Sequence, residues 1–312
     1  MEKKIKELID KSNSIVLLTH ESPDGDAIGS VMAFFHYLTS INKTIDIVIP
    51  EVPELFNYIV DIDKAVDRSD KSYDLGIVLD CATKERIGQM NNEFDKCIDI
   101  LNIDHHKSNT LFGTINYVWG SEPACCQVLY YLFKDLEVKL DINMGISLMT
   151  GLLTDTNGFR NDMVNKKTFL MAANMYDYGV DIYGLYKKVL ATKNKARYEL
   201  MKIVVNRLEF FADGKIAFAY ITKEDMESVS AKLGDHEGLV DIGREVLGVE
   251  VSIFVREENG YKVSLRSNTK VDVSMIAAKF GGGGHTMASG CKINDNLENV
   301  KNILIKEVEK VL

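Results

Sequence analysis

The sequence predicts an α/β fold in two domains, and three observations carry this prediction. A chain of 312 residues is long enough for two domains. In its first half, short apolar runs alternate with segments of helical period, which is typical of a parallel sheet with right-handed crossovers. After Gly214, strand-like runs return and lead into a glycine-rich segment, which indicates a smaller domain of mixed α/β type.

Five strands are expected in the first half of the chain. They are rich in Val, Ile and Leu, and they cover residues 14–20, 44–50, 74–80, 97–104 and 114–119. The first and third are nearly continuous apolar runs, as expected of strands that are buried on both faces. Flanking helices are predicted between the strands, over 27–40 and near 53–60.

Helical patterns dominate residues 121–212. Ser121 is the predicted N-cap of one helix, with Pro123 in its first turn. A long amphipathic segment over 194–211 is the predicted helical connector. We therefore divide the chain into a first domain, a helical linker and a second domain, over 1–190, 191–213 and 214–312.

The second domain should contain strands and two helices. The strand-like runs cover 215–221, 249–257 and 260–267, and the helical patterns cover 273–280 and 296–312. Between the two helices lies GGGGHTMASG, residues 281–290. Its four glycines can form a flexible turn, or they can let backbone N–H groups approach a phosphate closely. His285 and Arg266 would add hydrogen-bonding or charged contacts in the second case.

The composition limits the possible ligands. Asp and Glu outnumber Lys and Arg by 46 to 37, which gives a net charge of −9. Proteins that track a long nucleic acid usually present a basic face, because each neutralised phosphate adds affinity. The acidic balance argues against long nucleic acids and remains compatible with a small phosphorylated ligand held by a few groups and metal ions.

No segment of the sequence predicts contact with a membrane. No run approaches about 18 consecutive apolar residues, and the amino-terminal segment lacks the apolar core of a signal peptide. We therefore expect a cytoplasmic protein. The cysteines show no C-x-x-C spacing, which predicts buried free thiols at Cys81, Cys97, Cys125, Cys126 and Cys291.

Three of the predicted strands end in residue types that bind metal ions. The first strand leads into His20, Asp24 and Asp26, the third ends at Asp80, and the fourth ends in the run Asp104, His105 and His106. Because the carboxyl ends of parallel strands meet at one edge of a sheet, we expect these side chains to lie close together. Asp155 follows a helical run that could reach the same edge.

Crowded carboxylates and imidazoles repel one another and shift each other's pKa unless a cation neutralises them. Oxygen-rich sites with a minority of imidazole suit Mn²⁺ or Mg²⁺ better than zinc. Two ions about 3.5–4 Å apart, bridged by one carboxylate, are the usual arrangement for phosphoester hydrolysis. Asp80, on the central strand, is the natural bridge.

Each motif alone also has a structural explanation. Asp24 can cap the helix that follows it, Asp80 can end a strand, and Asp155 can cap a helix or turn. These explanations would all have to hold together at corresponding strand ends. The joint pattern therefore favours a metal site.

In order along the chain, these motifs resemble the four motifs of the DHH phosphoesterases. His20-x-x-x-Asp24-x-Asp26, Asp80, Asp104-His105-His106 and Asp155 carry the resemblance in the first domain. RSN at 266–268, GGGGH at 281–285 and ASG at 288–290 resemble the DHH-associated C-terminal domain. The resemblance covers nearly the whole chain and is strongest to the nanoRNase and pAp-phosphatase (NrnA-type) members.

The resemblance implies two divalent ions, first of all Mn²⁺, with Mg²⁺ or Co²⁺ as substitutes. One ion would be held by His20, Asp24 and Asp80, and the other by Asp26, Asp80, His105 and Asp155. The implied catalytic residues are His106, which faces the scissile phosphate, Asp80, and Asp104, which orients the histidines. The implied contacts to the terminal nucleotide are Arg266, Ser267, Asn268, Gly283, Gly284 and His285.

One position departs from the family pattern. A glycine is expected two residues after Asp155, and Asn157 stands there instead. Because Asn tolerates a left-handed backbone, we expect a similar turn with a possible change in substrate contact.

The implied activity is Mn²⁺-dependent hydrolysis in a cleft between the two domains. The substrates would be RNA oligonucleotides of a few residues, degraded to mononucleotides, and 3′-phosphoadenosine-5′-phosphate (pAp), converted to AMP. The same family leaves open cyclic di-AMP or its linear product pApA as substrates. An inorganic pyrophosphatase, which the GGGGH segment argues against, and a non-catalytic nucleotide sensor are further alternatives. Family analogy also suggests a homodimer.

Overall fold

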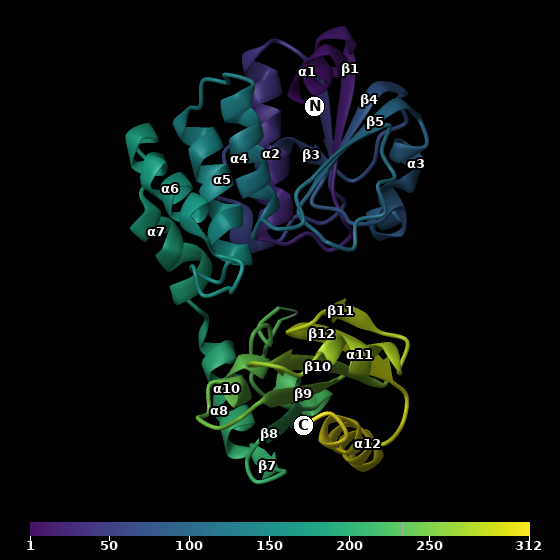
Figure 1. The fold of residues 1–312 in the computed structure, drawn as a ribbon, viewed down its shortest axis with the longest axis vertical. Helices are drawn as coiled ribbons and strands as arrows, with labels where there is room; N and C mark the ends of the chain where they lie inside the picture. Colours follow the sequence, from purple (N-terminus) through teal and green to yellow (C-terminus); the bar gives the residue numbers. More distant parts are fainter. Residues whose placement is uncertain (233) are drawn as a thin grey trace. The chain divides into compact units, whose positions relative to one another are not determined.

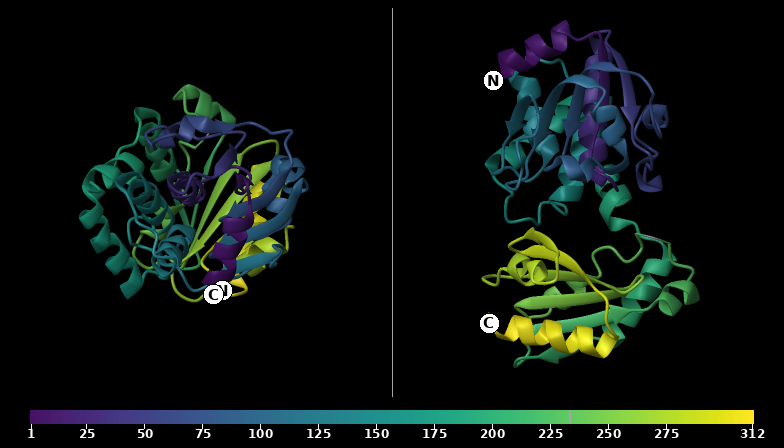
Figure 2. Two further views of the ribbon diagram at one scale, coloured as in Figure 1. Left: turned by 90° about the horizontal axis from the view of Figure 1, so that it is seen from above. Right: turned by 90° about the vertical axis from the view of Figure 1, so that its right-hand side faces the viewer.

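The computed structural model describes residues 1–232 and 234–312. The chain forms two compact units, Met1–Thr192 and Lys193–Leu312. Each unit contains one six-stranded sheet with helices packed against it (Figures 1 and 2). The predicted α/β class, with a parallel first sheet and a mixed second sheet, is confirmed.

The first sheet is parallel throughout, in the order β3-β2-β1-β4-β5-β6. Its strands are β1 (Ser14–Leu18), β2 (Thr44–Val48), β3 (Ala65–Val66), β4 (Tyr73–Leu79), β5 (Cys97–Asp104) and β6 (Ile115–Val118). The five predicted strands are present, and β1 and β4 are buried along almost all of their length. Strand β3 was not predicted, because two residues are too few to show an alternating pattern.

Helices cover both faces of this sheet. They are α1 (Glu2–Lys11), α2 (Gly25–Ser40), α3 (Asn91–Phe94), α4 (Cys125–Asp135), α5 (Ile142–Asp155), α6 (Lys166–Met175) and α7 (Ile182–Tyr186). Helices α2, α4 and α5 pack side by side on one face, and α3 lies on the other (Figure 1). Nearly every residue of α2 is buried, and only residues 19–24 separate its amino terminus from the carboxyl end of β1.

Two helix predictions in the first unit are wrong. Helix α4 begins at Cys125 with Ala124 at the N-cap, so Ser121 does not cap it and Pro123 lies before its first turn. The segment near 53–60 is a single 3₁₀ turn over Glu54–Phe56, and not an α-helix. Phe56 and Ile59, three residues apart, are both buried, and this spacing suits a 3₁₀ turn.

The second unit contains the mixed sheet, in the order β11-β12-β10-β9-β8-β7, in which only β8 and β9 run parallel among the described strands. Its strands are β7 (Glu209–Phe211), β8 (Ile216–Ile221), β9 (Val251–Glu257), β10 (Tyr261–Ser267), β11 (Gly283–His285) and β12 (Ala288–Ile293). Its helices are α8 (Lys195–Asn206), α9 (Lys223–Ser228), α10 (Val240–Arg244), α11 (Val273–Ala278) and α12 (Leu297–Glu309). Figure 2 shows α12 lying along this sheet, where Val300, Leu304 and Val308 are buried.

The predicted helix over 194–211 is too long. Helix α8 ends at Asn206, and the following residues form β7, which pairs with β8. Leu200 and Val204 of α8 pack against Ala219 and Ile221 of β8, so the helix is part of the second unit's core.

The cysteines of the chain are free thiols. All five cysteines are free, and all except the partly exposed Cys97 are buried, as predicted. Among the described residues, no helix combines the length and the apolar character that crossing a lipid bilayer requires.

Candidate metal centre and active site

The structure brings all the predicted ligands of the first domain to the carboxyl edge of the first sheet. They lie in three overlapping groups, in each of which the donor atoms are within 4.8 Å of one another. The groups are His20, Asp24 and Asp80; Asp26, His105 and Asp155; and Asp80, Asp104, His105 and His106. The parallel topology produces this convergence, because β1, β4 and β5 are neighbours in the sheet and end at the same edge.

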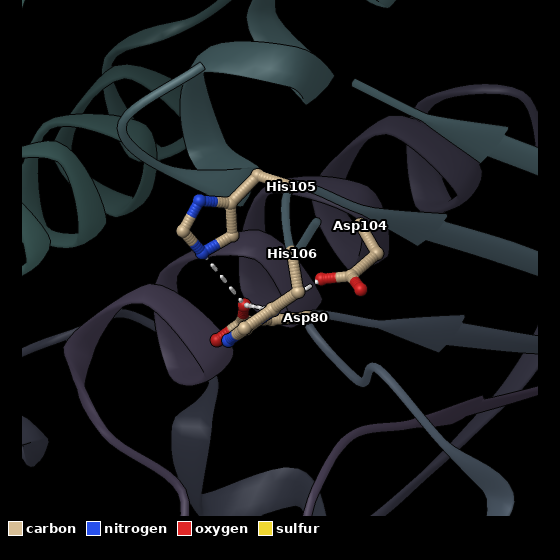
Figure 3. Close-up of side chains that lie close together, drawn as sticks. All are labelled: Asp80, Asp104, His105 and His106. Atoms are coloured by element: carbon tan, nitrogen blue, oxygen red, sulfur yellow. Dashed lines mark hydrogen bonds and ion pairs between the residues drawn. The ribbon is translucent and has the colours of Figure 1, made fainter. Parts of the chain in front are cut away.

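Asp80 lies at the centre of the cluster (Figure 3). Its Oδ2 is 3.6 Å from Nε2 of His20, and its Oδ1 is 3.5 Å from Nε2 of His105. The side chain is almost fully buried, and Oδ1 accepts no hydrogen bond from the described residues. A buried carboxylate oxygen in this state is normally satisfied by a proton or a metal ion.

The backbone of Asp80 has a left-handed conformation, with φ of 54°. This conformation is uncommon for residues other than glycine, although Asp and Asn tolerate it better than most. The turn comes directly after β4, and the amide of Asp80 still donates to the carbonyl of Ile103 at 3.0 Å. Backbone strain of this kind tends to occur at functional sites.

Backbone carbonyls set the tautomers of the two histidines nearest to Asp80. Nδ1 of His20 lies 2.8 Å from the carbonyl oxygen of Glu21, and Nδ1 of His105 lies 3.1 Å from that of Glu122. A carbonyl only accepts hydrogen bonds, so each Nδ1 carries a hydrogen and each Nε2 is the nitrogen that faces Asp80. A ring nitrogen that faces a carboxylate needs a proton or a metal ion between them, so the donor set fits a divalent metal ion that replaces the protons.

The pKa shifts of the clustered groups also favour a bound cation. Burial, followed by the charge of Asp80, raises the pKa of Asp26 to about 7. Burial and the charge of Asp26 also raise the pKa of Asp155 well above its usual value. Burial alone would lower the pKa of His105, but its contact with Asp80 outweighs burial and raises it strongly. Without a metal ion, the cluster therefore holds protons that a bound cation would replace.

Asp24 also has its structural role. It is the N-cap of α2, and its Oδ1 accepts the backbone N–H groups of Asp26 at 2.9 Å and Ala27 at 3.1 Å. Because this cap fixes the start of α2, it also fixes Asp26 in the first helical turn. The structural explanation and the ligand prediction for Asp24 are therefore compatible.

Asp26 is oriented by a distant helix. Its carboxylate accepts the backbone N–H groups of Cys125 at 2.5 Å and Cys126 at 2.9 Å, in the first turn of α4. These are the orphan donors that a side-chain cap normally satisfies, and they lie at the positive end of the helix dipole. Each carboxylate oxygen keeps a second lone pair for a metal ion. Cys125 and Cys126 are 99 and 100 positions from Asp26, so no local pattern in the sequence indicates this contact.

Asp104 contacts one of the two adjacent histidines. Its Oδ1 lies 2.7 Å from Nδ1 of His106, and the carboxylate is fully buried (Figure 3). His105 is instead held by the carbonyl of Glu122. Of the two histidines, Asp104 therefore contacts His106 and not His105, whereas the family resemblance implies that it orients both.

The turn after Asp155 has the predicted backbone. Asn157 has φ of 47° and is followed by Gly158 and Phe159, which are also left-handed, with φ of 67° and 69°. The prediction that asparagine adopts the left-handed conformation here is confirmed.

In the second unit, the register of the sheet aligns Arg266 with His285. Both residues pair with Ala288, Arg266 from β10 on one side of β12 and His285 from β11 on the other. The glycine-rich segment is therefore an edge strand and a hairpin, whereas the sequence left open whether it is a turn. Glycine is depleted in strands, so the pattern did not indicate one.

The side chains of Ser267 and Asn268 are engaged within the second unit. Ser267 Oγ donates to Glu250 at 3.2 Å, and Asn268 Nδ2 donates to the carbonyls of Val249 and Arg244. Glu250 also accepts the backbone N–H groups of Thr269, Lys270 and Val271. Burial would raise the pKa of Glu250, but the hydrogen bond from the Thr269 hydroxyl and the three backbone N–H groups lower it to about 2. The sequence did not single out Glu250, which holds the loop after β10.

The fold requires a glycine at some positions of the glycine-rich segment and not at others. Gly284 has φ of 143°, and a Cβ there would lie 2.5 Å from the carbonyl oxygen of Ala288. Gly283 does not have a positive φ. A Cβ added there would have no described heavy atom within 4 Å. The described fold therefore explains Gly284 and leaves Gly283 without a structural reason.

Comparisons with known proteins agree with this geometry. Residues 14–153 match the DHH family, N-terminal domain, and residues 213–312 match the DHHA1 domain. The chain is 30% identical over 282 residues to the bifunctional oligoribonuclease and PAP phosphatase NrnA of Thermus thermophilus, covering 89% of this chain and 84% of the relative. It is 27% identical to the probable enzyme of the same name from Streptococcus mutans, covering 94% and 95% of the two chains.

A solved structure is similar over the whole chain. An exopolyphosphatase-related protein from Bacteroides fragilis matches with a TM-score of 0.93 and 26% identity, covering 99% of this chain and 95% of that one. The family match, the named relatives and the similar solved structure all indicate a phosphoesterase, and the donor cluster at the sheet edge is the kind of site that such an enzyme needs. The chain belongs to the DHH phosphoesterase family, and it is an enzyme, a hydrolase with DHH and DHHA1 domains.

Proposed function

We propose that this protein degrades short RNA oligonucleotides to mononucleotides and converts pAp to AMP. The observation that carries the proposal is the convergence of carboxylates and imidazoles on Asp80, in a chain whose relatives are named oligoribonuclease and PAP phosphatase. The net charge of −9 supports short substrates, since affinity for a long nucleic acid relies on many neutralised phosphates.

We assign two divalent ions, preferentially Mn²⁺, to the cluster. His20, Asp24 and Asp80 would hold one ion, and Asp26, Asp80, His105 and Asp155 would hold the other. The two oxygens of Asp80 lie toward different histidines, which supports its assignment as the bridge. Bound ions of this kind activate water as a nucleophile and neutralise charge on the phosphate.

The protein's own groups position and polarise the substrate. His106 is assigned to the scissile phosphate, where it would donate a hydrogen bond to an oxygen that gains charge during the reaction. The contact of its Nδ1 with Asp104 supports this role, because it leaves Nε2 to face the substrate. Arg266, His285 and the backbone at Gly283 are assigned to the phosphate and sugar of the terminal nucleotide, with Ser267, Asn268 and Gly284 supporting them.

A pair of adjacent glycine substitutions separates binding from folding. Gly283→Ala should keep the thermal stability of the wild type and raise KM about tenfold, or about 1.4 kcal/mol, because its methyl group would project toward the bound nucleotide. Gly284→Ala should instead lower the free energy of unfolding by about 1–3 kcal/mol, because φ there is left-handed and the backbone of β12 is close. Thermal melts and steady-state kinetics check both variants. Wild-type kinetics in Gly283→Ala would remove this position from the binding site.

Product analysis tests the proposed function. Purified protein with Mn²⁺ is incubated in parallel with pApA, pAp, RNA of three to five nucleotides, cyclic di-AMP and pyrophosphate. We expect 5′-AMP from pApA and pAp, and mononucleotides from the RNA. Preference for cyclic di-AMP would indicate cyclic dinucleotide turnover, and release of phosphate from pyrophosphate alone would indicate a pyrophosphatase. Nucleotide binding without any turnover would indicate a sensor, and each of these three results would refute the proposal.

A further inference from the structure

Two asparagines lie behind the contact between Asp104 and His106. Asn102 is on β5 and is fully buried, and Asn109 lies in the loop that follows His106. Nδ2 of Asn109 donates to Asp104 Oδ2 at 2.6 Å and to Asn102 Oδ1 at 2.8 Å. Nδ2 of Asn102 donates to the carbonyl oxygens of Val78 and Cys81, each at 3.2 Å. A hydrogen-bonded chain therefore runs from the end of β4 to His106.

The orientation of both amides follows from their partners. The carbonyls of Val78 and Cys81 can only accept, so the nitrogen of Asn102 must face them and its oxygen must face Asn109. The nitrogen of Asn109 then faces Asn102 and the carboxylate of Asp104, which also only accepts. Its oxygen accepts the backbone N–H of Leu111 at 2.7 Å. Nδ2 of Asn109 also lies 3.3 Å from the carbonyl oxygen of Cys81, so each of these contacts joins a donor to an acceptor.

The chain holds Asp104 at both oxygens. Oδ1 receives His106 Nδ1 at 2.7 Å, and Oδ2 receives Asn109 Nδ2 at 2.6 Å. A carboxylate held at one oxygen can still rotate about its Cβ–Cγ bond, whereas one held at both has a fixed plane. A fixed plane fixes the ring of His106, because the hydrogen bond at Nδ1 is directional.

We propose that Asn102 and Asn109 are positioning residues that fix Asp104 and, through it, the ring of His106 toward the substrate. The inference deepens the proposed function and rests on it for the role of His106. Neither asparagine is among the residues assigned to the metal ions or the nucleotide. Their effect should therefore appear in the catalytic step, and much less in the binding of metal or substrate.

Substitution of Asn109 tests the proposal. Asn109→Ala removes the donor to Asp104 and the acceptor for Leu111. In Asn109→Ser, the hydroxyl can still accept from Leu111, as in Ser turns, but is too short to reach Asp104. Both variants should lower kcat about 10- to 100-fold, the usual cost of losing a partner that orients an active-site group. KM and the affinity for Mn²⁺ should change less than about threefold.

Asn116→Ala is the matched control. Asn116 lies on the neighbouring strand β6 and makes three hydrogen bonds of its own, to Leu111 and to the amide and carbonyl of Gly113. Its loss should cost a similar amount of stability while kcat stays within about twofold of the wild type. Recovery of wild-type kcat in Asn109→Ser would show that Asn109 only stabilises the loop. An equal loss of kcat in Asn116→Ala would likewise overturn the proposal.

NMR of the metal-free protein with ¹⁵N-labelled histidine gives a readout that needs no turnover. The Nδ1–H of His106, bonded to Asp104, should give an exchange-protected signal in the wild type and in Asn116→Ala. The signal should be lost or strongly shifted in Asn109→Ser, and an unchanged signal would refute the positioning role. A wild type inactive on RNA and pAp would refute the proposed function, while this spectrum would still decide the role of the asparagines.

Discussion

Asp80→Asn should lower kcat by about 10³-fold or more, which corresponds to about 4 kcal/mol of lost transition-state stabilisation. The two oxygens of Asp80 face His20 and His105, so a neutral amide would weaken both of the proposed metal sites at once. The fold should survive, because asparagine matches aspartate in size and tolerates the φ of 54° at this position. Alanine would add backbone strain to the loss of charge, so it is the less informative substitution. Hydrolysis of pApA and titration with Mn²⁺ measure the effect.

Asp74→Asn, at the other end of β4, is the control for this substitution. Asp74 Oδ2 accepts the backbone N–H groups of Asn13 at 2.7 Å and Ser14 at 3.0 Å, at the amino edge of the sheet. Its replacement should reduce thermal stability slightly and leave kcat unchanged. The bridging role is wrong if Asp80→Asn keeps a kcat within tenfold of the wild type while remaining folded.

The candidate site could be predicted in large part because its signals are local. Continuous apolar runs mark β1 and β4 as central strands, and the polar residue at the end of each run marks the functional edge. His20, Asp80 and Asp104 all follow this rule. The parallel topology then gathers residues that are far apart in sequence, without any further information.

Contacts between distant segments could not be predicted. The sequence predicts a helix start at Ser121, because Ser is a common N-cap, but α4 starts at Cys125 and its first N–H groups are satisfied by Asp26 on α2. Glu250 lies just before β9 and accepts backbone N–H groups of the loop after β10. No periodicity or motif in the sequence marks it. In both cases a carboxylate satisfies backbone N–H groups of another segment, and such partners depend on tertiary packing.

The glycine-rich segment shows a different limit. GGGGH predicts a close approach of the backbone to a phosphate, whereas the close approach that the structure contains is that of Gly284 to the neighbouring strand β12. Sequence alone could not separate this structural glycine from Gly283, since both stand in one run of four glycines. Only the positions of surrounding atoms distinguish a glycine that the fold requires from one that a ligand would require.

Mn²⁺ should bind with the release of protons, so that its affinity rises as the pH is raised toward about 7, the pKa of Asp26. Burial and neighbouring carboxylates raise the pKa of Asp26 to about 7 and that of Asp155 above its usual value. In His20 and His105 burial acts the other way, but contact with Asp80 prevails and raises both pKa values. Below these pKa values a proton occupies the donor and competes with the ion, and above them it does not. Each proton released should contribute about tenfold in affinity per pH unit.

Calorimetry in buffers with different ionisation enthalpies measures the number of protons released. Asp155→Asn removes one carboxyl group with a raised pKa, so it should release fewer protons and show a shallower pH dependence. Asp141→Asn at the opposite end of α5 is the matched control, because Asp141 caps the helix through Met144 N–H and asparagine caps equally well. Buffer-independent heats at pH 6.5 would mean that the ligands are already deprotonated, and the assignment of raised pKa values to this cluster would then be wrong. Proton release that persists in Asp155→Asn and vanishes in Asp80→Asn would assign the exchange to the histidines and Asp26, the groups that Asp80 holds together.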